Sequence, residues 1–111
     1  MITGNMVKIR TKRYFSGQPL WFIVGRVLDS SENWVKVEGK GIGFFHGKVD
    51  PVDIDEDIRV LLLPRENIAH IRILPDDFDM MNINVEREGF RYYMKVENAP
   101  DASLGEGPEK A

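Results

Sequence analysis

Apolar and polar positions alternate along the first part of the chain, between Met6 and Phe15. Val7, Ile9 and Thr11 occupy one side of this alternation, and Lys8, Arg10 and Lys12 occupy the other. A period of two places successive side chains on opposite faces of an extended backbone. The pattern therefore predicts a half-buried β-strand with one basic face.

Two further apolar runs predict a hairpin. Residues 20–28 read LWFIVGRVL and are rich in β-branched and aromatic side chains, which favour strands. Gly25 interrupts this run, and glycine inside a strand indicates a bend or a bulge. A polar turn at residues 29–33 leads to the alternating run 34–38.

Residues 39–57 are rich in glycine and then in aspartate. Ile42 and Phe44 extend the third strand, and we expect the rest to be an exposed loop. Residues 58–63 form a fourth apolar run, which ends at Pro64 because proline has no backbone donor. After the tight turn 64–67, residues 68–74 predict a fifth strand.

The C-terminal third predicts a hairpin and a tail. Residues 83–86 and 90–96 read as two strands, and the segment beyond Glu97 is acidic, small and interrupted by proline and glycine. Such a composition buries too little apolar surface to fold. We therefore predict one domain over residues 1–96 and a disordered acidic tail over residues 97–111.

The composition fits one ordinary globular domain of 111 residues. The chain has no cysteine and no segment long and apolar enough for a membrane helix, and its first residues lack the features of a signal peptide. We expect a cytoplasmic protein without membrane contact. Residues 1–49 carry eight Lys and Arg against three Asp and Glu, while residues 50–111 carry seven against fifteen. This asymmetry indicates either a basic face in the first half or merely a solvated acidic second half.

No enzyme motif is present. The sequence lacks a nucleophile elbow, a zinc-protease motif and a phosphate-binding glycine loop before a helix. Asp50, Asp53, Asp55 and Asp57 have calcium-loop spacing, but the central glycine and the later glutamate are missing. His46 and His70 are read as a loop residue and a strand residue. We expect no catalysis, no metal and no cofactor.

Five short strands with a tight turn before the fifth are typical of SH3-like and Sm-like barrels. Residues 22–29, followed by residues 33–37, resemble the first motif of the Sm-like family: a strand with a bending glycine, a polar turn and a returning apolar strand. Residues 61–71 (LLLPRENIAHI) resemble the second motif. The resemblance covers residues 7–74 and implies a small five-stranded barrel with an added C-terminal hairpin.

The resemblance also implies a function. Sm-like proteins form rings that hold splayed single-stranded RNA bases between the two motif turns. By this resemblance Asn33 supplies an amide, Arg65 supplies a guanidinium plane, and Trp34 or Tyr14 supplies a stacking ring. The alternative is that Asn33 only accommodates a turn and Arg65 is a solvated surface residue. The chain departs from the family at Pro64–Arg65, where Arg-Gly or a basic-polar pair is usual.

The basic face of the first strand has two interpretations of equal weight. Lys8, Arg10 and Lys12 precede Tyr14 and Phe15, and such a cluster of charges and rings is suited to RNA phosphates and bases. Alternatively, the charges protect an edge strand from aggregation.

The resemblance finally implies a cyclic homo-oligomer in which the fourth strand of one copy pairs with the fifth strand of the next. The residues expected at this interface are Arg59, Val60, Leu61, Leu62, Ile71 and Ile73. The alternative is a small protein-interaction module without nucleic-acid binding, whose partner meets an exposed strand edge or Phe44 and Phe45. The acidic pI of about 5.4 favours the alternative, and the paired motifs favour the ring.

Overall fold

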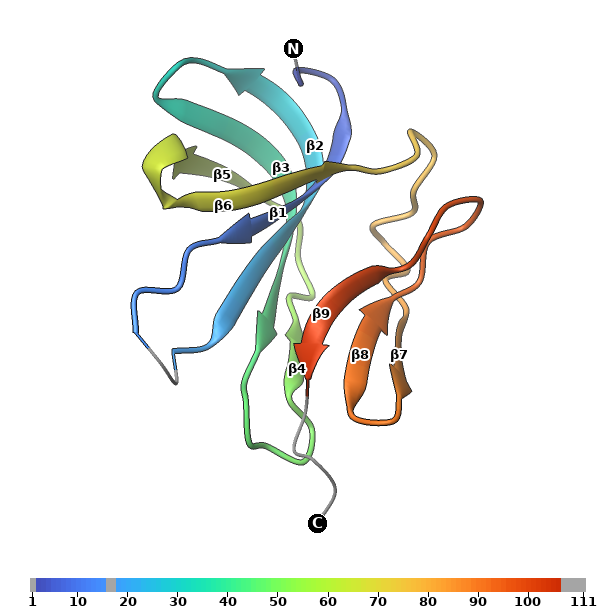
Figure 1. Cartoon of the computed structure of the whole chain (residues 1–111). Coiled ribbons are helices and arrows are strands. Elements are labelled where there is room, and N and C mark those ends of the chain that lie inside the picture. Colours follow the sequence, from blue (N-terminus) through green and yellow to red (C-terminus); the bar gives the residue numbers. More distant parts are fainter. Residues whose placement is uncertain (1, 16–17, 107–111) are drawn as a thin grey trace.

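The computed structural model describes residues 2–15 and 18–106, and the fold is mainly β, as predicted (Figure 1). Nine strands are present in the described residues: β1 (Met6–Thr11), β2 (Leu20–Ser30), β3 (Trp34–Phe44), β4 (Val52–Ile54), β5 (Arg59–Pro64), β6 (Ile68–Ile73), β7 (Val85–Glu88), β8 (Arg91–Met94) and β9 (Ala102–Glu106). A single 3-10 turn, η1 (Arg65–Asn67), joins β5 to β6. Within these ranges no helix is long and apolar enough to cross a membrane.

Six strands form one antiparallel sheet with the order β4-β3-β2-β1-β6, and β5 pairs with β3 beside β4. The long strand β3 pairs with β2 along one edge and with two strands along the other, where its first half pairs with β5 and its last three residues pair with β4. Strand β1 lies inside the sheet, between β2 and β6. The predicted strands 20–28, 58–63 and 68–74 are confirmed, each within two residues of the predicted ends.

Gly25 and Gly39 allow the backbones of β2 and β3 to approach each other closely. They are paired across β2 and β3. A Cβ atom added to Gly25 would lie 2.3 Å from the carbonyl oxygen of Glu38, and one on Gly39 would lie 2.0 Å from that of Val24. Any larger residue would force the strands apart, so the predicted special role of Gly25 has a steric basis. Both strands curve strongly along their length (Figure 1).

The pairing shows an open sheet in the described part of the chain. Strands β5 and β6 are consecutive but are not paired with each other; each is bonded to a different neighbour, β3 or β1. A closed barrel is therefore not shown. The segment 39–57 is also less loop-like than predicted, since Val52–Ile54 pairs with the end of β3. Val52 and Ile54 pack against the buried core, which explains why this part of the acidic segment is ordered.

Strands β7, β8 and β9 form a second antiparallel sheet. Its β7–β8 hairpin is the predicted C-terminal hairpin. The predicted tail and the domain end at residue 96 are wrong, because β9 pairs with β8 and buries Ala102 and Leu104, which are 3% and 1% exposed. Residues 107–111 lie outside the described residues. This segment forms a strand because it docks on the rest of the molecule: two alternate apolar side chains are enough to order it when neighbouring strands supply the surface that they cover.

The main sheet is covered on both faces. On one face, β1, β2 and β3 bury an aliphatic cluster against β5 and β6: Val7, Ile9, Ile23, Val27, Val35 and Val37, with Leu61, Leu63, Ile68 and Ile71 partly buried beside it. We call this the barrel-side face. The other face packs Met6, Phe22, Val24 and Ile42 against Tyr92, Met94 and Leu104 of the second sheet. We call this the second-sheet face, and it determines where the basic side chains of β1 lie.

Candidate functional site

The two motif turns lie together, as the sequence predicts for Asn33, Trp34 and Arg65. The backbone N–H of Arg65 donates to the carbonyl of Asn33 at 2.9 Å, and its Nε donates to the carbonyl of Ser31 at 2.6 Å. Trp34 is paired with Pro64 across β3 and β5. Asn33 is exposed, whereas Trp34 and Arg65 are half-buried. Arg65 therefore fixes the turn through Nε, and the exposed amide of Asn33 stands next to it.

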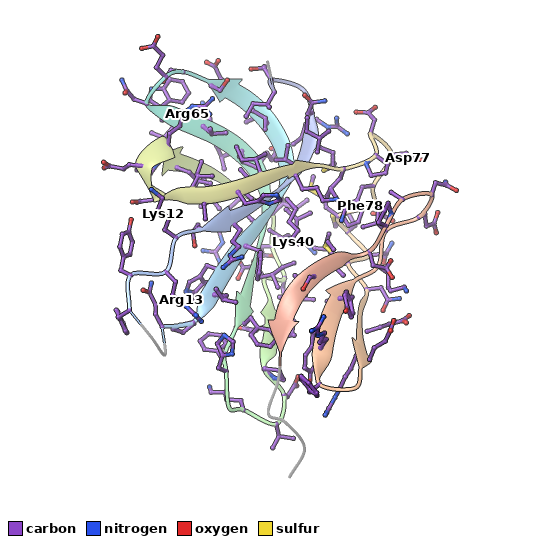
Figure 2. The ribbon with its side chains drawn as sticks, in the orientation of Figure 1. Lys12, Arg13, Lys40, Arg65, Asp77 and Phe78 are labelled. Carbon is purple, nitrogen blue, oxygen red and sulfur yellow. The ribbon has the colours of Figure 1, made fainter. Side chains whose placement is uncertain are left out.

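Lys12 and Tyr14 contact η1 at Asn67, its last residue, whereas Arg65 is its first; Figure 2 labels Lys12 and Arg65. The backbone N–H of Lys12 donates to the carbonyl of Asn67 at 2.8 Å, and the Tyr14 hydroxyl donates to Asn67 Oδ1 at 2.7 Å. The Tyr14 ring remains mostly exposed. The ring is thus held at its hydroxyl end while its faces are open to solvent, an arrangement suited to stacking.

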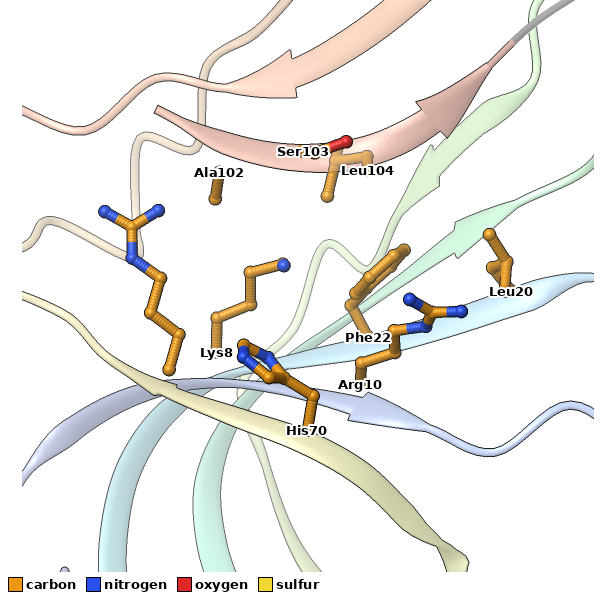
Figure 3. A pocket seen from close by; sticks show the side chains of 9 residues that line it. Lys8, Arg10, Leu20, Phe22, His70, Ala102, Ser103 and Leu104 are labelled. Atoms are coloured by element: carbon orange, nitrogen blue, oxygen red, sulfur yellow. The ribbon is translucent and has the colours of Figure 1, made fainter. Parts of the chain in front are cut away.

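Lys8 and Arg10 belong to a different site. Their side chains leave β1 on the second-sheet face and line a cavity of about 370 Å³ between the β1–β6 ladder and β9 (Figure 3). The cavity is also lined by His70 and Arg72 of β6, by Leu20 and Phe22 of β2, and by Ala102, Ser103 and Leu104 of β9. The structure thus separates the basic and aromatic cluster of the sequence into two places.

The structure corrects two expectations for β1. The basic face is not solvated along its whole length, because β9 leaves Lys8 only 6% exposed while Arg10 and Lys12 stay exposed. It is not an edge strand either, since it is paired on both sides. Protection of an edge is therefore excluded as the reason for its charges.

Burial changes the acid–base behaviour of Lys8. The loss of hydration, reinforced by the charges of Arg72 and Arg10, lowers the pKa of Lys8 from 10.5 to about 8. The ammonium lies 4.8 Å from the centre of the Phe22 ring, a cation–π contact that compensates part of this cost. Lys8 remains mostly charged at neutral pH and is poised to lose its proton slightly above it.

The expected interface residues lie on the two outer strands. Val60 and Leu62 of β5 are 52% and 63% exposed, and Ile73 of β6 is 56% exposed. Arg59 is also exposed, while Leu61 and Ile71 are half-buried and support the barrel-side core. Within the described ranges each strand has a partner on one side only. Apolar side chains therefore accompany two free strand edges.

Other candidates lose support. Phe44 is fully buried, so it cannot meet a partner as the interaction hypothesis proposed. Asp55 is engaged with the Gly41 backbone N–H at 3.1 Å and with Arg59 at 3.5 Å. No group of three or more His, Asp or Glu side chains in the described residues could hold a metal ion. His46 contacts Arg13 at 3.1 Å.

Sequence reasoning missed Arg72, the role of His70 and the contribution of β9. The available signal was the basic residue at every second position of residues 70–72, which repeats the pattern of Lys8 and Arg10. Only the strand register shows that the two patterns face each other. No family model, curated protein or solved structure matches this chain. The site must therefore be interpreted from its own chemistry.

Proposed function

We propose that this chain is an Sm-like barrel subunit that assembles edge to edge into a cyclic homo-oligomer and binds single-stranded RNA. The observation that carries the proposal is the β5–η1–β6 unit. Two outer strands, each free along one edge, are joined by a short turn that holds Arg65 beside Asn33. This unit combines the assembly surface with the RNA contact of the Sm-like motif.

The assembly part rests on strand edges. A free edge that carries apolar side chains recruits further strands unless charge or cover prevents it. The edge of β5 presents Val60 and Leu62, and β6 presents Ile73. Pairing β5 of one copy with β6 of the next satisfies both edges by the same contact, and a head-to-tail contact of this kind closes into a ring when the rotation permits.

The RNA part rests on repetition. One Asn33 amide and one Arg65 guanidinium bind a base weakly, but a ring repeats the pair once per copy and the contacts add through multivalency. Tyr14 and Lys12, across η1, extend the surface with an exposed ring and a charge. The net charge of −3 predicts modest affinity that falls with salt.

The mass of the protein in solution tests assembly. Light scattering should give a multiple of 12.8 kDa at micromolar concentration. Leu62→Lys should shift the mass toward the monomer because it places charge at the edge, whereas Met81→Lys, at an equally exposed apolar residue outside the strands, should not. A wild-type protein of one 12.8 kDa species would overturn the ring.

Fluorescence titration with labelled uridine-rich and adenine-rich oligonucleotides at low salt tests RNA binding. Arg65→Ala should weaken binding severalfold and leave the mass unchanged, while Arg87→Ala on the distant hairpin should have little effect. If an intact ring binds no oligonucleotide at tens of micromolar protein, the RNA proposal fails and the protein-interaction alternative takes its place.

A further inference from the structure

The cavity between the two sheets is lined by basic side chains, and no carboxylate lines it among the residues that the structure describes. Lys8, Arg10, His70 and Arg72 form one wall, and Leu20, Phe22 and Leu104 form most of the rest. Figure 3 shows Lys8, Arg10 and His70 rising from β1 and β6 toward β9. Its volume of about 370 Å³ lies within the range of roughly 300–1,000 Å³ that small-molecule sites occupy.

The strand register places these basic side chains in directly opposed pairs. Lys8 is opposite Arg72 and Arg10 is opposite His70 in the antiparallel β1–β6 ladder. Like charges that face each other across a ladder destabilise the sheet, and alternate residues of one strand share a face. The Lys8–Arg72 pair thus concentrates positive charge on one small area at a cost to the stability of the sheet.

The second buried lysine of the described residues shows the contrast. Lys40 is 7% exposed and lies between the sheets (Figure 2), but the carboxylate of Asp79 is close enough that Lys40 contributes to lowering the pKa of Asp79. Lys8 has no such partner: the charges that act on it are those of Arg72 and Arg10, and they lower its pKa. The Asp79 carboxylate therefore lies within electrostatic range of one buried lysine, whereas the charges acting on the other are positive.

One carboxylate near Arg72 is already engaged. Asp101, just before β9, accepts a hydrogen bond of 2.6 Å from Lys95 and another of 3.2 Å from the Val96 backbone. Arg72 lies near enough to help lower the pKa of Asp101, but its own hydrogen bond goes to the carbonyl of Pro100. That bond fixes the guanidinium at the cavity rim. In the described residues no ion pair joins Lys8, Arg10 or His70 to a carboxylate.

We propose that this cavity is a binding site for a phosphate monoester, held by Lys8, Arg10 and Arg72 at its phosphate and by Leu20, Phe22 and Leu104 at its organic part. The site goes beyond the proposed function and does not depend on ring formation or on Asn33 and Arg65. A doubly charged phosphate compensates the opposed cations, and its oxygens accept from two guanidinium groups and the ammonium.

The expected ligand has both a charged and an apolar part because the cavity has both kinds of wall. Inorganic phosphate alone uses only the cationic wall and should bind more weakly. The same chemistry occurs in a free phosphorylated metabolite and at the 5′ end of an RNA strand. Adenosine monophosphate, adenosine, and oligonucleotides with and without a 5′ phosphate distinguish these sources.

Thermal unfolding and calorimetric titration of the full chain at low ionic strength test the site. Adenosine monophosphate should raise Tm by several degrees and bind at least tenfold more tightly than adenosine, with inorganic phosphate between them. Lys8→Met should weaken the binding of adenosine monophosphate at least tenfold. The Tm of this variant without ligand should equal or exceed that of wild type. Arg10→Gln, at an exposed side chain, gives the same loss of affinity without a change in the core.

Lys36→Met is the matched control, because it removes one exposed charge of β3 outside the cavity. It should bind adenosine monophosphate as wild type does. A 5′-phosphorylated oligonucleotide that binds more tightly than its 5′-hydroxyl form, with the difference lost in Lys8→Met, assigns the site to RNA ends; equal binding assigns it to a small molecule. The proposal is overturned if wild type shows no response to phosphate or to adenosine monophosphate, or if Lys36→Met weakens binding as much as Lys8→Met.

Discussion

The two faces of the main sheet are both buried, but they are built from different side chains. The barrel-side face is aliphatic throughout, with Val7, Ile9, Val35 and Val37 fully buried. The second-sheet face buries apolar side chains as well, yet it also encloses Lys8 and Lys40 and keeps a cavity open beside Lys8. Residues only one position apart in β1 thus meet opposite environments.

The two faces differ in what their buried side chains do for stability: the aliphatic ones stabilise the fold, whereas the buried charge is only tolerated. Removing aliphatic surface from water stabilises the barrel-side face without any polar compensation. Burying an ammonium beside two guanidinium groups destabilises the fold, so the surrounding apolar core must offset this cost. Charged groups kept at such a cost are commonest at functional sites. The comparison therefore supports the phosphate site that we propose on the face covered by the second sheet, apart from the β5–η1–β6 unit proposed for assembly and RNA.

The largest expected effect tests whether both faces are equally part of the fold. Ile9→Ala on the barrel-side face and Leu104→Ala on the second-sheet face should each lower the unfolding free energy by about 2–5 kcal/mol, because each removes a fully buried side chain. Chemical denaturation measures both. The exposed control Lys36→Ala should stay within about 0.5 kcal/mol. A Leu104→Ala variant as stable as that control would show that β9 does not belong to the core.

A smaller expected effect is a pH dependence of the unfolding free energy that arises from Lys8 on the second-sheet face. The folded-state pKa of Lys8, about 8, lies below its ordinary value of 10.5, so between these pH values the unfolded chain binds the proton more tightly. The free energy of unfolding should therefore rise with pH across this window as Lys8 loses its proton, by on the order of 3 kcal/mol at most. Arg72, Arg10 and His70 line the same cavity as this ammonium, and the Asp101 carboxylate interacts with Arg72.

Denaturation of wild type and Lys8→Met at pH 7 to 10.5 isolates that contribution, because other titrating groups are common to both proteins. The stability of wild type relative to the variant should increase across the window. A constant difference between the two proteins would show that Lys8 is hydrated like a surface lysine, and the contrast between the faces would disappear.

The strands of the main sheet could be predicted because alternation and turn residues are local signals. β1, β2, β5 and β6 follow directly from the order of apolar residues and from Gly25 and Pro64. Strand β9 could not be predicted, since Ala102 and Leu104 alone make a weak apolar pattern within an acidic segment. Its order depends on the surface of Tyr92 and Met94, to which no local signal points.

The site was predictable in part. Lys8 and Arg10 stand out as a basic face from the alternation of β1 alone. Their opposition to Arg72 and His70 depends on the β1–β6 register, which joins strands far apart in the sequence and is set by packing on both faces. The burial of Lys8 depends on β9 in turn, so a residue expected in solvent lies at the centre of the molecule.

The most direct test of the account is an NMR titration of the Lys8 side chain in the folded protein without phosphate. Selectively labelled lysine Cε and Hε resonances, assigned by comparison with Lys8→Met, report each ammonium separately. The account predicts a midpoint near pH 8 for Lys8, which moves upward when adenosine monophosphate saturates the cavity. A midpoint at the ordinary value of 10.5 with and without the ligand would contradict it.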